Sequence, residues 1–325
     1  MITAELRRVI LAAARERVRP DEDPLLRPGP QPGSYASSLP FRLAGGDPRR
    51  AAAALAPRLS AEPWIAAADV TGPGYLTVTV TRDALAGLAV RIARAGPACA
   101  ASDALHGRTV HGPAGADLTA APDWPSARAA LAAQLTGRLA AAAGATVTCD
   151  AERSVAPPPA PASPVPGAVA YAGLDAVRFA LARMPPGGVP PRAAVIARHV
   201  LDNPAYAVRY AHAAAAAVLR WAAGSGIPGP GGFQPRLLAE PGELALLDAL
   251  SWLPERVAMA AHRGRPDDFA GYLEQLAART IDTMSTTGFT TIPSISSERL
   301  WLADAARTGL AAGLGLLGIG APSRL

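Results

Sequence analysis

The spacing of apolar positions in the first hundred residues predicts a mixed helix and strand unit. Residues 2–18 carry apolar side chains at helical intervals, which predicts an amphipathic helix. An Asp-Pro pair predicts the start of a second helix, over 47–59, because Asp caps helices and Pro fits their first position. Residues 75–81 alternate apolar and β-branched polar side chains, which predicts a strand, with a shorter one at 65–70. A third helix is predicted over 83–95.

From residue 169 onward the apolar spacing is almost entirely helical. The predicted helices are 172–183, 190–201, 204–223, 242–262 with a break at Pro254, 266–284 and 296–317. Segments rich in Pro and Gly (20–33) and in Thr and Ser (284–295) are predicted to be loops.

The middle of the chain has a different character. A helix is predicted over 126–143, followed by a short strand at 146–148. The proline run at 156–166 is typical of an extended linker rather than a helix or strand interior. The expected fold class is α+β, with a small α+β domain at 1–95, a middle segment at 96–168 and an all-α helical domain at 169–325.

Composition narrows the function classes. All 31 basic residues are arginine and there is no lysine, so any mechanism that needs a lysine amine is excluded. The net charge of +5 and the isoelectric point near 9.7 suit an anionic partner such as RNA, and they also suit an ordinary, modestly basic globular protein. Aromatic residues make up only 5%, so the core must be built from Ala, Leu and Val.

Compartment and metal chemistry follow from a few positions. Cys99 and Cys149 are far apart and form no zinc or disulfide pattern, which favours a reducing cytoplasm. His106 and His111 lack a third ligand at metal spacing, and no cofactor is predicted. Charged residues before the first apolar run argue against a signal peptide, and polar interruptions of the Ala-rich stretches argue against a membrane span.

Several motifs in the C-terminal half resemble one family. Residues 175–178 (Asp-Ala-Val-Arg) match the signature of DALR anticodon-binding domains. Residues 202–213 are similar to the arginyl-tRNA synthetase stretch that contains Tyr-Ala-His-Ala, and 253–276 and 316–322 resemble the following helices and the C-terminus. The order and spacing of these matches agree with the family.

The N-terminal unit resembles the additional N-terminal domain of arginyl-tRNA synthetases. The resemblance rests on residues 33–39, on the helix that begins after Asp47, and on 72–76. In that family this domain touches the elbow of the tRNA. The resemblance therefore implies an RNA contact at Tyr75.

The resemblance also predicts what is missing. Class I synthetases use a His-x-Gly-His motif and a Lys-Met-Ser-Lys-Ser motif to stabilise charge on phosphates. The second motif cannot exist in a chain without lysine, and residues 123–128, where the first should fall, hold neither His nor Gly. One strand–helix–strand unit needs about 30 residues, so a complete catalytic domain does not fit in 96–168. The expectation is a synthetase-related protein with no catalytic residues, in which 121–148 is a remnant.

Candidate RNA contacts lie on the helix predicted at 204–223. Tyr206, Arg209 and Tyr210 share one side by their i, i+3 and i+4 spacing, and aromatic rings can stack on unpaired bases while arginine holds phosphates. Both tyrosines could instead be half-buried packing residues. Arg220 is predicted to extend the basic face.

Three replacements bear on specificity. Ala207 and Ala214 stand where the family has a tyrosine and an arginine, and Leu325 stands for its C-terminal methionine. These family positions grip the anticodon loop, so RNA binding in general is favoured over recognition of one anticodon. Arg209 stands where glutamine is usual.

Asp175, Arg178 and His212 are interpreted as structural. Arg178 is expected to pair within the helical bundle as a tether, and His212 is expected to be a packed core histidine rather than a base.

Three functions remain in ranked order. The first is a non-catalytic protein that binds tRNA. The second is a protein-interaction module, with a partner such as a true synthetase, whose RNA binding has decayed. The third is a protein that presents tRNA to another enzyme. No membrane partner is expected.

Overall fold

A four-stranded antiparallel sheet forms the N-terminal part of the structure, a computed structural model that describes residues 1–15, 24–43, 46–113, 115–148, 164–291 and 294–325. In spatial order the strands are β1 (Leu26–Pro28), β2 (Ser34–Ser37), β4 (Tyr75–Val80) and β3 (Ile65–Thr71). The two predicted strands are confirmed. Strand β1 lies within the segment predicted to be a loop. Its Pro28 is tolerated because β1 is an edge strand, where one missing N–H can face away from the ladder.

The helices of this part are α1 (Ile2–Ala13), α2 (Pro48–Ser60), α3 (Arg82–Ala86) and α4 (Leu88–Ala95). As predicted, α2 begins after Asp47, whose carboxylate accepts the Arg49 amide at 2.9 Å, and it packs against β3 and β4. The helix predicted over 83–95 is divided at Gly87. A Cβ there would lie 3.0 Å from the Asp83 carbonyl oxygen, so the tightened turn favours glycine.

The middle of the chain forms a strand, a helix and a parallel strand. Strand β5 (Thr109–His111) pairs with β6 (Thr146–Thr148), and α5 (Trp124–Ala142) connects them. The predicted helix and the strand at 146–148 are confirmed, whereas β5 was not predicted. Gly144 follows α5 with φ +89, and a Cβ there would meet the Ser102 carbonyl oxygen at 3.0 Å.

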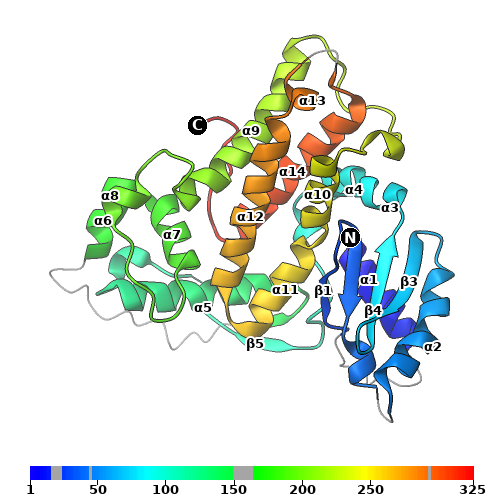
Figure 1. Cartoon of the computed structure of the whole chain (residues 1–325). Helices are drawn as coiled ribbons and strands as arrows, with labels where there is room; N and C mark the ends of the chain where they lie inside the picture. Colours follow the sequence, from blue (N-terminus) through cyan, green and yellow to red (C-terminus); the bar gives the residue numbers. More distant parts are fainter. Residues whose placement is uncertain (16–23, 44–45, 114, 149–163, 292–293) are drawn as a thin grey trace.

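The C-terminal part is helical, and α9, α12 and α14 pack together at its centre (Figure 1). Its helices are α6 (Pro164–Ala172), α7 (Leu174–Arg183), α8 (Ala193–Ile196), α9 (Pro204–Gly224), α10 (Pro241–Ser251), α11 (Leu253–Arg263), α12 (Pro266–Met284), α13 (Thr287–Thr290) and α14 (Ser297–Leu316). The break predicted at Pro254 is present, between α10 and α11. With the sheet, these helices confirm the α+β class.

The prediction of a helix over 190–201 is wrong for most of that range, since only the single turn α8 forms. The buried Asn203 explains the early end: its amide donates to the carbonyls of Ile196 at 2.8 Å and Arg198 at 2.7 Å. A longer helix would use those carbonyls for its own bonds.

Two further segments differ from prediction. Residues 156–163 of the predicted linker lie outside the described residues. Pro164 and Pro166, which were predicted to belong to the same linker, lie in the first turn of α6, where prolines remove no helical hydrogen bond. The segment 284–295 was predicted as a loop and contains α13.

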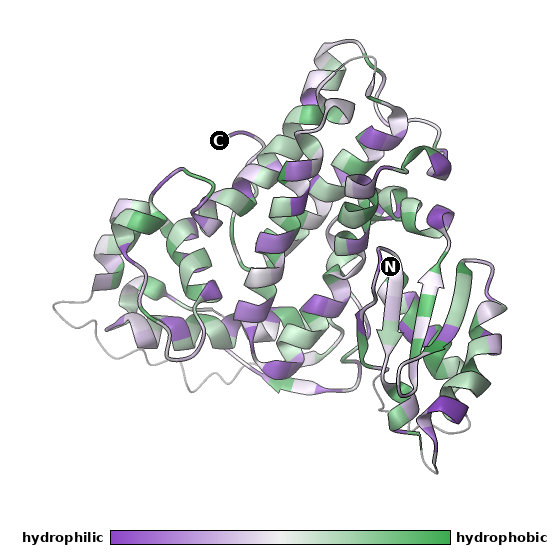
Figure 2. Ribbon diagram, in the orientation of Figure 1, coloured by the Kyte–Doolittle hydropathy of each residue, from purple (hydrophilic) through white to green (hydrophobic). Residues whose placement is uncertain are grey.

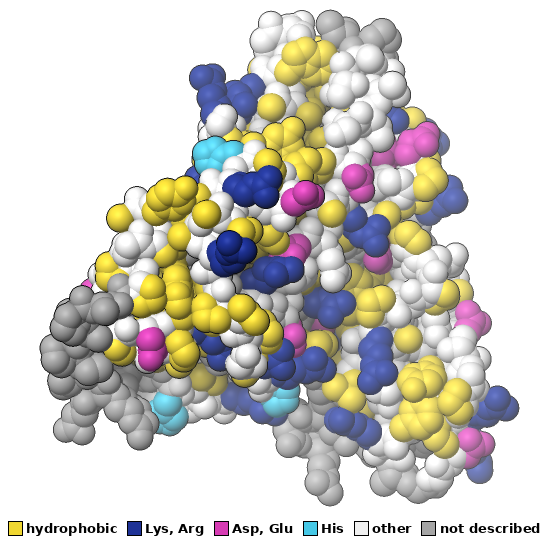
Figure 3. All heavy atoms as spheres, turned by 60° about the vertical axis from the view of Figure 1, so that its left-hand side comes forward, with side chains coloured by type: hydrophobic (Ala, Val, Ile, Leu, Met, Phe, Trp, Pro, Cys, Tyr) yellow, Lys and Arg dark blue, Asp and Glu magenta, His cyan; other side chains and the backbone are white. Residues whose placement is uncertain are grey.

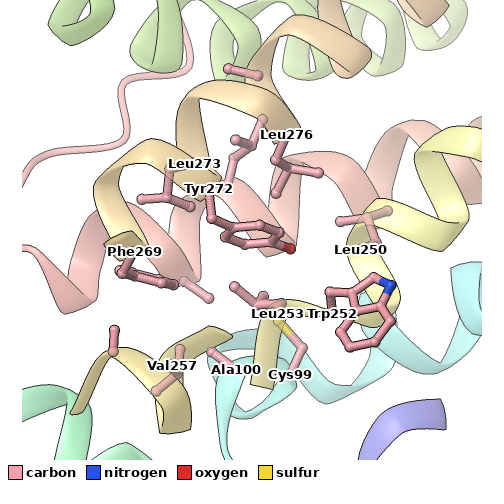
Figure 4. Packing of buried hydrophobic residues seen from close by; sticks show 14 of the residues in the cluster. Cys99, Ala100, Leu250, Trp252, Leu253, Val257, Phe269, Tyr272, Leu273 and Leu276 are labelled. Carbon is pink, nitrogen blue, oxygen red and sulfur yellow. The ribbon is translucent and has the colours of Figure 1, made fainter. Parts of the chain in front are cut away.

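Buried apolar side chains form one continuous cluster from α1 to the C-terminal residues. Figure 2 shows the hydrophobic residues concentrated on the faces that the helices and the sheet turn toward one another. In Figure 4, Cys99 and Ala100, which follow α4, lie among Leu253, Val257 and Tyr272 of α11 and α12. Helix α4 also packs on α14, so the N-terminal part contacts the helical part directly.

Buried polar contacts reinforce this joint. Arg7 of α1 forms an ion pair with Glu255 of α11 at 2.7 Å. Tyr35 Oη and Ser251 Oγ are hydrogen-bonded at 2.8 Å, and the Thr3 hydroxyl donates to the Ser251 carbonyl at 2.9 Å. Such contacts need defined geometry, so they fix how the sheet sits on α10 and α11.

Within the described ranges, no single helix has the length and apolar character needed to cross a membrane. The pair α6 and α7 meets that test together, but it is bent by 120°.

Candidate nucleic-acid interface

Helix α9 presents the predicted RNA contacts because one of its faces is buried. Asn203 caps it by accepting the Ala205 amide, and Pro204 occupies its first position. Val208, Ala211 and Ala215 face the core. Tyr206, Arg209 and Tyr210 lie off this stripe, and their side chains are half-buried or exposed.

An aromatic ladder runs along the start of α9. The rings of His199 and Tyr206 stack at 5.4 Å with 11° between their planes, and those of Tyr206 and Tyr210 stack at 5.8 Å with 27°. Tyr206 is half-buried, whereas His199 is exposed and Tyr210 is 37% exposed. The rings thus pack on one another, and the rings at both ends of the ladder remain partly accessible to solvent.

The predicted cations have different environments. Arg209 is half-buried, and its Nε is buried with no hydrogen-bond partner among the described residues. Arg220 is exposed and donates to the Ser323 carbonyl at 2.6 Å. Tyr75 belongs to the sheet, where its ring packs against Phe41 at 4.9 Å. Figure 1 shows β4, which begins at Tyr75, on the opposite side of the molecule from the start of α9.

Side chains of α7 and α9 hold the C-terminal tail, residues 317–325. Asp175 accepts the Gly320 amide at 3.1 Å, and Arg178 donates to the Leu317 carbonyl at 3.4 Å and to Gln134 at 3.0 Å. His212 Nδ1 is 2.9 Å from the Pro322 carbonyl oxygen. Together with Arg220, these residues fix the tail against the helix that carries the aromatic ladder.

The contact of His212 predicts a pH dependence of stability. Burial lowers the pKa of His212 below its ordinary value of 6.5, and the charge of Arg307 acts in the same direction. As the pH falls below 6.5, His212 therefore takes up a proton in the unfolded chain before it does so in the folded protein. The contribution of neutral His212 to the free energy of unfolding is thus fully present above pH 6.5 and decreases as the pH falls below it.

We therefore expect the wild type to lose more stability than a His212→Asn variant when the pH falls from about 7 to about 5. The asparagine amide can donate to the same carbonyl without titrating. Urea midpoints of both proteins at the two pH values measure the difference. An identical pH dependence in the two proteins would contradict this role of His212.

Small residues open a groove between α9 and α12. A hollow of about 530 Å³ is lined by Tyr210, Ala214, Ala217, Val218, Trp221, Ile281, Met284, Ser285, Phe289 and Thr290. A second hollow of about 460 Å³, toward the start of α9, includes Ala207 and shares Ile281. Ala214 lines the first hollow and Ala207 the second, and these are the two positions at which the resemblance implies larger residues in the family.

The segment of sequence that contains α9 is rich in arginine. Residues 176–239 contain seven arginines and one acid, Asp202, a net charge of +6 in a chain whose total is +5. The other residues together are therefore close to neutral. Figure 3 turns the side of α6 to α9 forward and shows arginine side chains dispersed among hydrophobic ones.

His199 is not among the residues predicted from the sequence. Its spacing from Tyr206 and Tyr210 suits one helix face, but the backbone turns between α8 and α9, so only the folded chain shows that the rings stack. As for metals, no three His, Cys, Asp or Glu side chains in the described part of the chain could together hold an ion.

Comparison with known proteins identifies the C-terminal part. Residues 208–325 match the DALR anticodon binding domain family. An arginine–tRNA ligase from Clavibacter sepedonicus is 40% identical over 159 residues, which make up 47% of this chain and 28% of that protein. A ligase from Kineococcus radiotolerans is 38% identical over 159 residues, 47% of this chain and 29% of its own length. The match thus spans less than a third of these relatives.

Among solved structures, the arginyl-tRNA synthetase of Thermus thermophilus aligns with the whole chain and 59% of its own, with a TM-score of 0.43 and 20% identity. By sequence, residues 208–325 are similar to DALR anticodon-binding domains, and about half of the chain is similar to part of the arginine–tRNA ligases.

Proposed function

We propose that the chain is a non-catalytic relative of arginyl-tRNA synthetases that binds tRNA through α9 and the residues around it. The observation that carries the proposal is the aromatic ladder at the start of α9, which lies in a segment, residues 176–239, with a net charge of +6. Arginines attract phosphates, and rings with free faces stack on unpaired bases. Tyr206, Arg209, Tyr210 and Arg220 are the proposed contacts on α9, and Tyr75 is a separate one on the sheet.

The absence of adenylation activity is part of the proposal. The chain contains no lysine, so it has no Lys-Met-Ser-Lys-Ser motif. The segment proposed as the catalytic remnant, 96–168, contains the single strand–helix–strand arrangement β5–α5–β6 among its described residues. The proposed division is an N-terminal unit at 1–95, this remnant, and the anticodon-binding unit at 169–325. The proposed function needs no cofactor.

Titration of the purified protein with total tRNA and with purified arginine tRNA tests the proposal. Gel shifts at two salt concentrations should show binding that weakens as salt rises, because each phosphate contact releases counterions. Equal affinity for both RNA samples would indicate binding without anticodon specificity, as the alanines at 207 and 214 suggest. Absence of a shift at the lower salt concentration would overturn the proposal.

A second candidate function rests on an exposed apolar surface. Its residues are Tyr171, Leu174, Val189, Val195, Val200 and Leu201. Apolar surface of this kind marks many protein-interaction sites. The chain could then act as a module for a protein partner, such as a true synthetase, or present tRNA to it. A failed tRNA titration, followed by co-purification with a synthetase, would favour this candidate.

A further inference from the structure

Two arginine side chains converge beside the C-terminal tail. Arg138 extends from α5 and Arg178 from α7, and these two helices pack together (Figure 1). A Cβ placed on Gly318 would lie 2.6 Å from Arg138 Nη1 and 2.8 Å from Arg178 Nη2. The separation of the two nitrogens therefore cannot exceed the sum of those distances. A single oxygen atom between them can accept a hydrogen bond from both.

The two guanidinium groups carry more charge than the described side chains around them balance. Arg178 is buried, and its acceptors are neutral, namely the Gln134 side chain at 3.0 Å and the Leu317 carbonyl at 3.4 Å. These bonds use two of the five N–H groups that an arginine carries. Arg138 is exposed and has no hydrogen-bond or ion-pair partner among the described residues. The carboxylate of Asp175 attracts Arg178, so one negative charge stands against two positive ones.

The proximity of the two arginines is unfavourable without a further negative group. Burial and the charge of Arg138 lower the pKa of Arg178 below its ordinary value, whereas Asp175 raises it. Solvent screens the repulsion between the two arginines only in part, because one of them is buried. An anion between them would remove this repulsion and add charge-assisted hydrogen bonds.

Gly318 keeps the space between the guanidinium groups open. Its φ is +70, a backbone conformation that favours glycine. Any other residue would place its Cβ at the point that both arginine nitrogens approach. Because Arg138 is exposed, the space can be entered from the side of that residue.

We propose that Arg138 and Arg178 form a binding site for a small oxyanion of the phosphate class, either the free ion or the terminal phosphate of a nucleotide. One oxygen bridges the two guanidinium groups, and a second accepts from the remaining N–H groups of Arg138. A tetrahedral phosphate presents oxygens in several directions, which suits arginines from two helices, whereas a planar carboxylate pairs best with a single arginine. The bound ion links α5 to α7 and to the tail at Gly318. The site shares no residue with the aromatic ladder and does not depend on the proposed tRNA binding.

Calorimetric titration of the full chain with inorganic phosphate and with AMP tests the site. Wild type should bind at least one of these probes. Replacement of Arg138 by alanine should weaken binding about tenfold, because it removes charge-assisted hydrogen bonds to the ion. Arg50→Ala removes an exposed arginine of α2 and should bind as wild type does. Equal affinities for both probes would show that the free ion is sufficient, and tighter binding of AMP would assign the site to a nucleotide.

Thermal unfolding provides a second measurement, since a ligand that binds the folded chain raises its unfolding midpoint. Phosphate also stabilises proteins because it is excluded from their surface, but that effect does not depend on one arginine. The midpoint should therefore rise more in wild type and in Arg50→Ala than in Arg138→Ala.

Two results would overturn the inference. One is the absence of binding of both phosphate and AMP to wild type, and the other is equal affinity in wild type and Arg138→Ala. If Arg138→Ala weakens tRNA binding while wild type binds neither small probe, Arg138 belongs to the RNA surface instead. In that case the small-anion site fails and the proposed function stands.

Discussion

Replacing Arg7 by methionine is expected to lower the free energy of unfolding by about 3–5 kcal/mol, the usual cost of removing one partner of a buried ion pair. Arg7 Nη2 lies 2.7 and 2.9 Å from the two carboxylate oxygens of Glu255. The two side chains are only 10% and 6% exposed. The substitution removes two charge-assisted hydrogen bonds to the buried Glu255 carboxylate, and water has little access to replace them.

Urea unfolding of the full chain measures this effect, and a surface pair provides the matched control. Arg91 and Glu5 lie 3.3 Å apart with side chains 41% and 36% exposed, so Arg91→Met should cost less than about 1 kcal/mol. The double variant Arg7→Met, Glu255→Leu should recover most of the lost stability, because neither buried charge remains. Equal effects of Arg7→Met and Arg91→Met would contradict a buried, energetically coupled pair.

The ion pair between Arg7 and Glu255 also affects how the two proposed RNA surfaces are placed relative to each other. Arg7 and Glu255 join α1 to α11, next to the bonds of Tyr35 and Thr3 with Ser251. The sheet that carries Tyr75 is therefore held at a fixed place relative to the bundle that carries α9. An RNA that touches both surfaces must fit this fixed geometry.

Local patterns in the sequence were sufficient to predict most elements. The Asp-Pro pair before α2, the alternation in β4 and the apolar spacing of α9 and α12 each reflect a preference within a few residues. Such preferences are expressed wherever the surrounding structure does not oppose them. The α+β class followed from them.

Contacts between distant residues could not be predicted in this way. The apolar spacing over 190–201 is helical, but the buried amide of Asn203 ends the helix after one turn. The stacking of His199 on Tyr206 depends on that interruption. Likewise, nothing in the local sequence pairs Arg7 with a glutamate 248 positions away. In each case the interaction that determines the local structure joins residues that come together only once the chain has folded.

Removal of both Arg209 and Tyr210 is expected to weaken tRNA binding about 100-fold. One stacked base contributes about 1–3 kcal/mol, and one phosphate contact adds a salt-dependent part. Tyr210 forms the outer end of the aromatic ladder, and the buried Nε of Arg209 has no partner among the described residues. The loss should exceed that of either single alanine variant, and the double variant should show a shallower salt dependence.

A matched double variant, Tyr171→Ala with Arg263→Ala, removes an exposed tyrosine and an exposed arginine that lie outside α9 and the arginine-rich segment. It should bind tRNA as the wild type does in the same gel-shift titration. Equal weakening by the two double variants would indicate attraction by net charge alone, since both lose one arginine. A selective loss in Arg209→Ala, Tyr210→Ala would place the contact on α9, which carries both residues.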